Sequence, residues 1–237
     1  LFDPATSMGG EPWAVDRHLD ALARAHRARP TIVVGVWNTD QRSREYAPAA
    51  PLATLPAPVV AEAGLVEIPL LSDNYVEFLT QELKSFVDAR YRTRPGRDDT
   101  VVMGSSMGGL ISLYALARRP DVFGAAGCLS THWPITVNPE FLQRPGDPRV
   151  ERLAQAYLDW LRVNLPAAGT HRLYFDHGTE HLDSLYAPFQ RRMDAVLADR
   201  GYRRDVDATS RVFPGTTHDE RAWRARLDLP LAFLLRP

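Results

Sequence analysis

The chain has 237 residues, of which 45% are hydrophobic and 24% are charged, and this suffices for one large α/β domain or two small ones. Its formal net charge of −1 gives no reason to expect nucleic acid or an acidic membrane surface as a partner. No stretch approaches the roughly 18 apolar residues of a membrane span, and no signal peptide is visible. Because the sequence begins at Leu1 without a methionine, a cytoplasmic and an exported protein are both compatible with it.

Segments with helical and with strand periodicity alternate along the chain. The helical segments are residues 13–28, 72–90, a run that follows residue 106, 150–161, 188–200 and 223–235. The strand-like segments are residues 31–37, 100–103, 123–129, 172–176 and 206–213. This alternation predicts an α/β fold with a mostly parallel sheet and helices on both faces. The sequence has no internal repeat and no clear boundary, so we expect residues 1–237 to form a single domain.

Three parts of the chain carry more specific expectations. Residues 31–37 are nearly all apolar and β-branched, which favours a strand buried on both faces. Residues 41–64 are rich in Pro and Ala, which favours an extended excursion over the surface that either borders a pocket or is simply exposed. Cys128 is the single cysteine, so an internal disulfide is excluded, and its small apolar neighbours predict a buried strand position.

The most informative motif is Gly-Ser-Ser-Met-Gly-Gly at residues 104–109, between an apolar strand-like run and a helix-like run. Strand, sharp glycine-flanked turn and helix form the context in which Gly-x-Ser-x-Gly presents a nucleophilic serine. A bulky side chain at Gly104 or Gly108 would clash with the crossing strand and helix. The alternative is a flexible turn of small residues, but the flanking pattern favours Ser106 as a nucleophile.

A serine hydroxyl needs a base, and that base needs an orienting acid. His218 follows the last predicted strand, where the base of a Ser–acid–His chain order belongs. The segment 176–183 follows the preceding strand and offers three carboxylates, those of Asp176, Glu180 and Asp183. We favour Asp183 as the acid, with Glu180 as the alternative, while Asp176 lies nearest the strand and can tie the loop together.

The same segment allows a rival interpretation as a metal site. His177 and His181 stand four residues apart, which is a ligand spacing on a helix, and Glu180 and Asp183 lie between and after them. Gly178 interrupts the segment and argues against a helix there. We therefore expect no metal and no cofactor.

Acyl transfer also needs backbone donors for the oxyanion. The N–H of Met107, the residue after the nucleophile, is the first expected donor. The second normally comes from the loop after an earlier strand, and we expect it at or just before Leu1-Phe2-Asp3.

Three motifs together resemble the Putative esterase family of α/β-hydrolases. They are Gly104-Ser105-Ser106-Met107-Gly108-Gly109-Leu110, Asp176-x-Gly178-Thr179-x-x-Leu182-Asp183 and Pro214-Gly215-x-x-His218-x-Glu220-x-x-Trp223. The family includes enterochelin esterases, feruloyl and acetyl xylan esterases, S-formylglutathione hydrolase and the antigen 85 mycolyltransferases. The resemblance implies an α/β-hydrolase fold, Ser106 as nucleophile, His218 as base and Asp183 as acid. It also implies that strands which precede the Leu1 position in relatives are missing from this sequence.

The pocket is less clear from the sequence. Trp13, His132 and Trp133 are candidate substrate contacts, with Trp37 and Tyr46 as further aromatic residues that could flank Ser106. Aromatic side chains there suit an aryl or sugar ester, but they equally suit packing. The expected activity is hydrolysis of a small-molecule carboxylic ester through an acyl-enzyme. Acyl transfer to an alcohol, as in antigen 85, and non-catalytic binding on a hydrolase fold stay open as alternatives, as does the oligomeric state.

Overall fold

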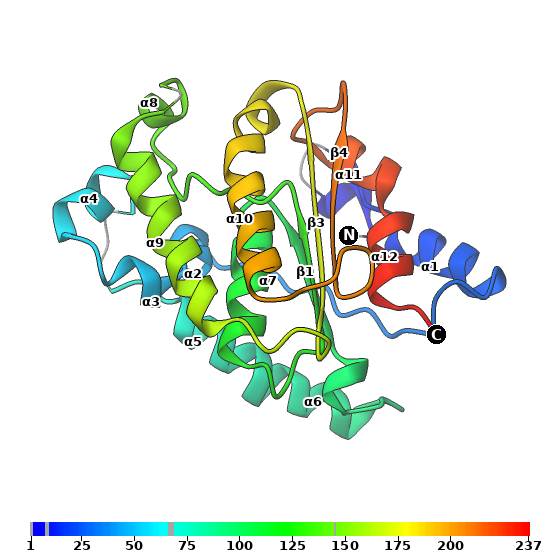
Figure 1. Ribbon diagram of the computed structural model, residues 1–237. Helices are drawn as coiled ribbons and strands as arrows, with labels where there is room; N and C mark the ends of the chain where they lie inside the picture. The colour runs from blue at the N-terminus through cyan, green and yellow to red at the C-terminus, as the bar shows by residue number, and fades with distance from the viewer. Residues whose placement is uncertain (1, 8–9, 66–68, 145) are drawn as a thin grey trace.

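The centre of the protein is a four-stranded parallel sheet in the order β1-β2-β3-β4 (Figure 1). The computed structural model describes residues 2–7, 10–65, 69–144 and 146–237. The strands are β1 (Val101–Ser105), β2 (Ala125–Leu129), β3 (Arg172–Gly178) and β4 (Ala208–Phe213). Each strand pairs in parallel with the next one along the chain. The predicted α/β class and parallel pairing are therefore confirmed for these four strands.

Helices cover both faces of this sheet (Figure 1). On one face lie α7 (Met107–Arg118), α9 (Pro148–Asn164) and α10 (Ala187–Asp199), which share a hydrophobic core. On the other face α1 (Val15–Arg24), α11 (Glu220–Arg226) and α12 (Asp228–Leu234) form a second, smaller core. Because both faces are covered, every residue of β2 is buried, Cys128 included.

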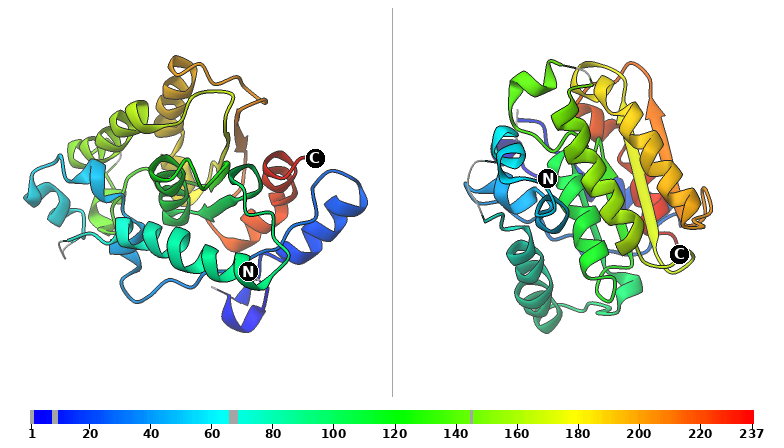
Figure 2. Two further views of the ribbon diagram at one scale, coloured as in Figure 1. Left: turned by 90° about the horizontal axis from the view of Figure 1, so that it is seen from below. Right: turned by 60° about the vertical axis from the view of Figure 1, so that its left-hand side comes forward.

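The predicted helix over residues 72–90 is one continuous rod beside the sheet (Figure 2). It consists of α5 (Ser72–Glu77), a π-helical segment η3 (Phe78–Leu83) and α6 (Lys84–Arg90). The Thr80 hydroxyl donates to the Val76 carbonyl at 2.8 Å just where the π-helical segment lies. Short elements complete the chain: η1 (Pro4–Thr6), η4 (Arg97–Asp99), α8 (Pro139–Leu142) and η5 (His181–Leu185).

The predicted strand at residues 31–37 is wrong. This segment has no regular secondary structure, and Ile32, Val34 and Trp37 are 49%, 43% and 74% exposed. Among the described residues β1 pairs only with β2, and a cavity rather than a backbone ladder lies between residues 31–36 and the outer edge of β1. A strand-like sequence needs a partner strand, and in the described residues this one has none.

The prediction of an extended conformation at residues 41–64 is also wrong, whereas the alternative that this segment borders a pocket holds, because Arg42 and Tyr46 line the same cavity. The segment forms three short helices, α2 (Arg42–Tyr46), α3 (Ala49–Leu52) and α4 (Ala57–Glu62). Prolines stand at or next to the starts of α3 and α4, where a missing N–H costs no hydrogen bond. Leu52 and Ala63 are buried against the core that contains α7 and α9, so this segment is a packed part of the fold.

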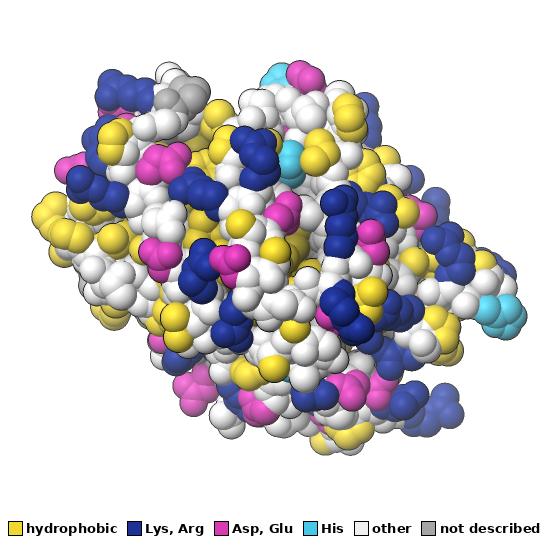
Figure 3. Space-filling model, viewed as in Figure 1, with side chains coloured by type: hydrophobic (Ala, Val, Ile, Leu, Met, Phe, Trp, Pro, Cys, Tyr) yellow, Lys and Arg dark blue, Asp and Glu magenta, His cyan; other side chains and the backbone are white. Residues whose placement is uncertain are grey.

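Basic and acidic side chains are interspersed over the face seen in Figure 3, in keeping with the nearly balanced charge of the sequence. Among the helices of the described residues, none is long and apolar enough to cross a membrane.

A substitution in α3 tests whether residues 41–64 belong to the core. Leu52 is 1% exposed, so Leu52→Ala should lower the free energy of unfolding by about 2–5 kcal/mol, measured by urea denaturation. Val163→Ala is the control, because Val163 is 75% exposed on α9 and its truncation should change stability by less than about 0.5 kcal/mol. Equal effects of the two changes would contradict a buried α3.

Candidate active site

Four polar residues follow the carboxyl ends of the four strands. Ser106 follows β1, Ser130 follows β2, Asp183 lies in η5 after β3, and His218 lies in the loop after β4. Parallel strands all present their carboxyl ends to one edge of the sheet, which is where sites in open α/β sheets form. Residues that are up to 112 positions apart in the chain therefore belong to one region of the fold.

Ser106 occupies a strained turn between β1 and α7. Its backbone angles are φ 57° and ψ −124°, a conformation that a residue with a side chain rarely adopts. The turn is held by hydrogen bonds from Ser106 N–H to the Leu129 carbonyl at 2.8 Å and from His132 N–H to the Ser106 carbonyl at 3.2 Å. The surrounding backbone thus imposes the sharp strand-to-helix turn that the motif predicts.

The two motif glycines have different roles. A Cβ at Gly104 would lie 2.7 Å from backbone atoms of Gly108, so this position admits only glycine without a backbone shift. A Cβ at Gly108 would meet nothing within 4 Å. The prediction of a clash at both positions therefore holds for Gly104 and is wrong for Gly108, where a Cβ would lie in open space.

Met107 is the first residue of α7, and the first N–H groups of an α-helix have no intrahelical acceptor. Its N–H thus lies at the positive end of the helix, directly after Ser106. The second oxyanion donor was expected at or just before residues 1–3. Leu1 lies outside the described residues, and Asp3 caps η1 by accepting from the Ala5 N–H at 2.9 Å.

His218 and Asp183 are in direct contact. His218 Nδ1 lies 2.5 Å from Asp183 Oδ1, and the Asp183 side chain is fully buried. Burial disfavours the charged carboxylate, but hydrogen bonds from His218, Ser130 and the Gly178 N–H together hold the pKa of Asp183 below its usual value. An ionised Asp183 accepts the Nδ1 proton, which leaves Nε2 of His218 as the basic nitrogen.

The other two carboxylates of the segment lie elsewhere. Asp176 forms a buried ion pair with Arg226, with Oδ1 2.9 Å from Nη2. Glu180 is exposed, and the hydroxyl of Thr179 donates to it at 3.4 Å. Neither contacts His218. The described residues contain no group of three or more His, Cys, Asp or Glu side chains placed to hold a metal ion.

Aromatic rings hold the His218 imidazole on two sides. The Trp223 ring meets it edge to face at 5.0 Å between centroids, and the Tyr186 ring does so at 5.6 Å. The Tyr186 hydroxyl also lies 2.8 Å from Nδ1 of His132, whose Nε2 lies 2.7 Å from the Thr136 carbonyl. A carbonyl only accepts, so Nε2 of His132 carries the proton and Nδ1 accepts from Tyr186. Burial lowers the pKa of His132 to about 4, which keeps its ring neutral at pH 7.

The predicted aromatic substrate contacts range from the buried core to the exposed surface. Trp133 is 1% exposed and stacks on Phe175 in the core, so its ring offers no surface to a substrate and this prediction is wrong. Trp13 is 9% exposed, packs against Trp223 and lines the cavity beside β1. His132 is 4% exposed, with both ring nitrogens engaged, and Trp37 lies at the surface.

Sequence patterns assigned no role to three residues near the site. Ser130 and Arg226 form a buried polar network under Asp183. In the sequence, Ser130 is marked only by its place after a strand, and Arg226 only by its place three residues after Trp223. Arg42 lies next to the nucleophile turn, with Nη1 3.6 Å from Met107 Sδ and its guanidinium over the Tyr46 ring. No carboxylate among the described residues pairs with Arg42.

A model of the family described as Putative esterase matches residues 11–234, nearly the whole chain. The chain belongs to the Putative esterase family. The resemblance drawn from the three motifs is thereby confirmed. None of the curated proteins matches the sequence.

Several solved structures share the fold of this family member. The enterobactin esterase FES from Shigella flexneri has a TM-score of 0.61 at 21% identity, over 91% of this chain and 47% of that one. The ferric enterobactin esterase from Salmonella typhimurium has a TM-score of 0.57 at 20% identity, over 91% and 45%. An IroE-like serine hydrolase from Shewanella oneidensis has a TM-score of 0.59 at 17% identity, over 92% and 65%. These likenesses show the α/β-hydrolase fold, and the chain spans about half the length of the two enterobactin esterases.

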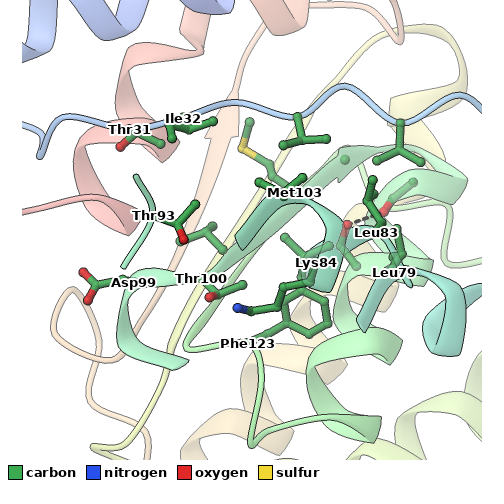
Figure 4. A pocket seen from close by; sticks show the side chains of 18 of the residues that line it. Thr31, Ile32, Leu79, Leu83, Lys84, Thr93, Asp99, Thr100, Met103 and Phe123 are labelled. Carbon is green, nitrogen blue, oxygen red and sulfur yellow. Dashed lines mark hydrogen bonds between the residues drawn. The ribbon is translucent and has the colours of Figure 1, made fainter. Parts of the chain in front are cut away.

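A cavity of about 830 Å³ runs along the outer edge of β1 in this esterase-family chain (Figure 4). Its walls include Thr31 and Ile32 on one side and Leu79 and Leu83 of the long helix on the other. It reaches the Ser106 turn, but neither His218 nor Asp183 lines it. The cavity therefore lies beside the nucleophile turn and not over the His218–Asp183 pair.

The motif glycines of this family member give a matched pair of variants. Gly104→Ala should lower the free energy of unfolding by about 1–3 kcal/mol, because the added methyl would displace the backbone of Gly108. Gly108→Ala should leave stability unchanged or slightly higher, since alanine fits α7 without a contact and is the better helix former. Thermal and urea unfolding of both variants measures this difference. A tolerated Gly104→Ala would contradict the close approach of the two backbones.

Proposed function

We propose that this protein is a serine hydrolase that cleaves carboxylic esters through an acyl-enzyme intermediate. The observation that carries the proposal is the hydrogen bond between His218 and Asp183, at the edge of the sheet where the strained turn presents Ser106. Membership of the Putative esterase family supports the ester as the bond that is cleaved. Ser106 would be the nucleophile, His218 the general base and Asp183 the group that orients it.

In the proposed acylation step, Ser106 Oγ attacks the carbonyl carbon of the ester while Nε2 of His218 takes the hydroxyl proton. Among the described residues no hydrogen bond engages Nε2 of His218 or the Ser106 hydroxyl, so both are free to meet when a substrate binds. Asp183 stabilises the imidazolium that forms, because its carboxylate stays ionised and in contact with Nδ1–H. Collapse of the tetrahedral intermediate then expels the alcohol, which receives the proton from His218.

The Met107 N–H would stabilise the oxyanion of that intermediate. Its place at the head of α7 aims an unpaired amide and the positive helix end at the charge that develops beside Ser106. Deacylation repeats the sequence with water as the nucleophile and His218 again as the base. When water accepts the acyl group, the overall reaction is hydrolysis. If an alcohol accepted it from the same acyl-enzyme, the reaction would be acyl transfer.

The relatives of known structure suggest which classes of ester to test as substrates. Several of them are named as enterobactin esterases, and the guanidinium of Arg42 beside Met107 offers a cation to a polar or anionic part of the ester. We therefore propose a screen of siderophore-type, feruloyl, acetyl and short-chain esters. A preference for one class would appear as a ratio of kcat/KM values.

Substitution of Ser106 tests its role as the nucleophile. Ser106→Ala should reduce turnover of p-nitrophenyl acetate by at least about 10³-fold, because no other group can form the acyl-enzyme. The circular dichroism spectrum should be unchanged. Ser105→Ala is the matched control, since Ser105 is the adjacent serine at the end of β1, and it should keep turnover within a few-fold. Equal turnover by the two variants would sink the proposal.

Substitutions of Asp183 and Glu180 distinguish the two candidate acids. Asp183→Asn should reduce kcat/KM by roughly 10²- to 10⁴-fold, because the amide cannot hold the Nδ1–H tautomer of His218. Glu180→Gln should keep kcat/KM within about two-fold, since Glu180 is exposed and does not contact His218. Steady-state kinetics of both variants on the same ester gives the comparison. A larger loss in Glu180→Gln would move the role of acid to Glu180.

A further inference from the structure

The Ser130 hydroxyl lies at the centre of a buried polar network below Asp183. Ser130 follows β2, is fully buried and has a positive φ of 42°. Its Oγ lies 2.7 Å from Asp183 Oδ2, 2.9 Å from Trp223 Nε1 and 2.9 Å from Arg226 Nη2. Because Ser130 is buried, has a positive φ and has three side-chain partners, its surroundings fix its conformation, and the backbone preference of a serine does not.

The direction of these hydrogen bonds follows from the chemistry of the partners. Indole and guanidinium nitrogens only donate, so Trp223 and Arg226 occupy the two lone pairs of the Ser130 oxygen. The single hydroxyl proton is therefore left for Asp183 Oδ2, which is ionised and only accepts. The network has one consistent arrangement, in which Ser130 donates to Asp183.

The network is anchored on the strand next to it. Arg226 is 4% exposed and makes a two-pronged ion pair with Asp176, through Nε at 3.2 Å and Nη2 at 2.9 Å. The Ser130 N–H donates to the backbone carbonyl of Asp176 at 2.9 Å. Arg226 comes from α11 and Asp176 from β3, so the position of the Ser130 hydroxyl is fixed from two elements.

We propose that Ser130 is a positioning residue that holds the Asp183 carboxylate in the orientation His218 needs. Asp183 Oδ2 accepts from Ser130 and from the Gly178 N–H at 2.6 Å, and these bonds leave Oδ1 to face His218 Nδ1. This inference rests on the proposed function, since it assigns a role around the same three groups. Ser130, which follows β2, thereby joins the three residues that follow β1, β3 and β4 as a fourth part of the site.

Other titratable and charged groups surround this cluster. The Tyr186 hydroxyl, from the residue between η5 and α10, is hydrogen-bonded to the His132 ring from the loop after β2. From β3, Asp176 is paired with Arg226 of α11, and His177 Nδ1 lies 2.6 Å from the Gly178 carbonyl. Among the described residues none of these groups donates a hydrogen bond to the Asp183 carboxylate, whose donors are His218, Ser130 and the Gly178 amide.

Loss of the Ser130 hydroxyl should change the acid–base behaviour of the site. Without this donor the Asp183 carboxylate is less stabilised and attracts the His218 proton more strongly. The acidic limb of the pH profile of kcat/KM should then move to higher pH, by up to about one unit for a hydrogen bond to a charged group. In the same variants kcat should fall by roughly 3- to 30-fold while KM changes little, because the hydroxyl does not touch substrate.

The test compares Ser130→Ala and Ser130→Gly with Thr209→Val. Both Ser130 variants remove the hydroxyl, and glycine tolerates the positive φ, so the pair separates a folding defect from the lost hydrogen bond. Thr209 is the matched control, a buried hydroxyl in β4 that donates to Asp205 at 2.7 Å, away from His218. The readouts are the pH profile with p-nitrophenyl acetate and the low-field proton resonance of the His218–Asp183 hydrogen bond.

Both Ser130 variants should shift the acidic limb and shift or broaden the low-field resonance, while Thr209→Val changes neither. A wild-type pH profile and an unchanged resonance in Ser130→Ala and Ser130→Gly would overturn the role of Ser130. The resonance is measured on the resting protein and needs no turnover. Failure of the proposed esterase activity would therefore appear in the wild type, separately from a failure of this inference.

Discussion

The shared carboxyl edge of the parallel sheet is the constraint on which the site depends. Four parallel strands end there, and the chain after each of them carries one of Ser106, Ser130, Asp183 and His218. The strands are paired in register, so their ends are fixed relative to one another before any side chain is placed. Backbone bonds across the edge, such as Ser106 N–H to Leu129 and Ser130 N–H to Asp176, extend this order into the loops.

The same edge of the sheet holds buried charged side chains. Asp176 and Arg226 form an ion pair that is almost fully buried, and Asp183 is buried beside it. Taking such groups out of water is costly unless each finds partners, and replacing them by apolar residues would often not weaken a fold. Here every carboxylate oxygen has a donor, through Arg226, Ser130, Gly178 or His218. We interpret the retained charge as serving the orientation of His218 rather than stability.

Much of this fold could be predicted from sequence periodicity, and the failures have physical causes. The four observed strands and the helix at residues 72–90 follow local patterns that tertiary contacts reinforce. Residues 31–37 have the composition of a strand, but hydrogen-bonding partners decide whether a strand forms, and composition does not report them. Chain order pointed to Ser106, Asp183 and His218, and their catalytic roles stay predictions. Ser130 was not predicted, because the partners that define it come from β3, η5 and α11.

The proposed esterase activity requires that Ser106 is a nucleophile activated by His218. Covalent labelling measures this directly. Wild-type protein is incubated with a fluorophosphonate, its intact mass is recorded, and the modified residue is located by peptide mapping. We predict a single added phosphonyl group on Ser106 and much slower labelling in His218→Ala, because the hydroxyl then lacks its base. An unlabelled wild-type protein, or a label on another residue with Ser106 untouched, would contradict the account.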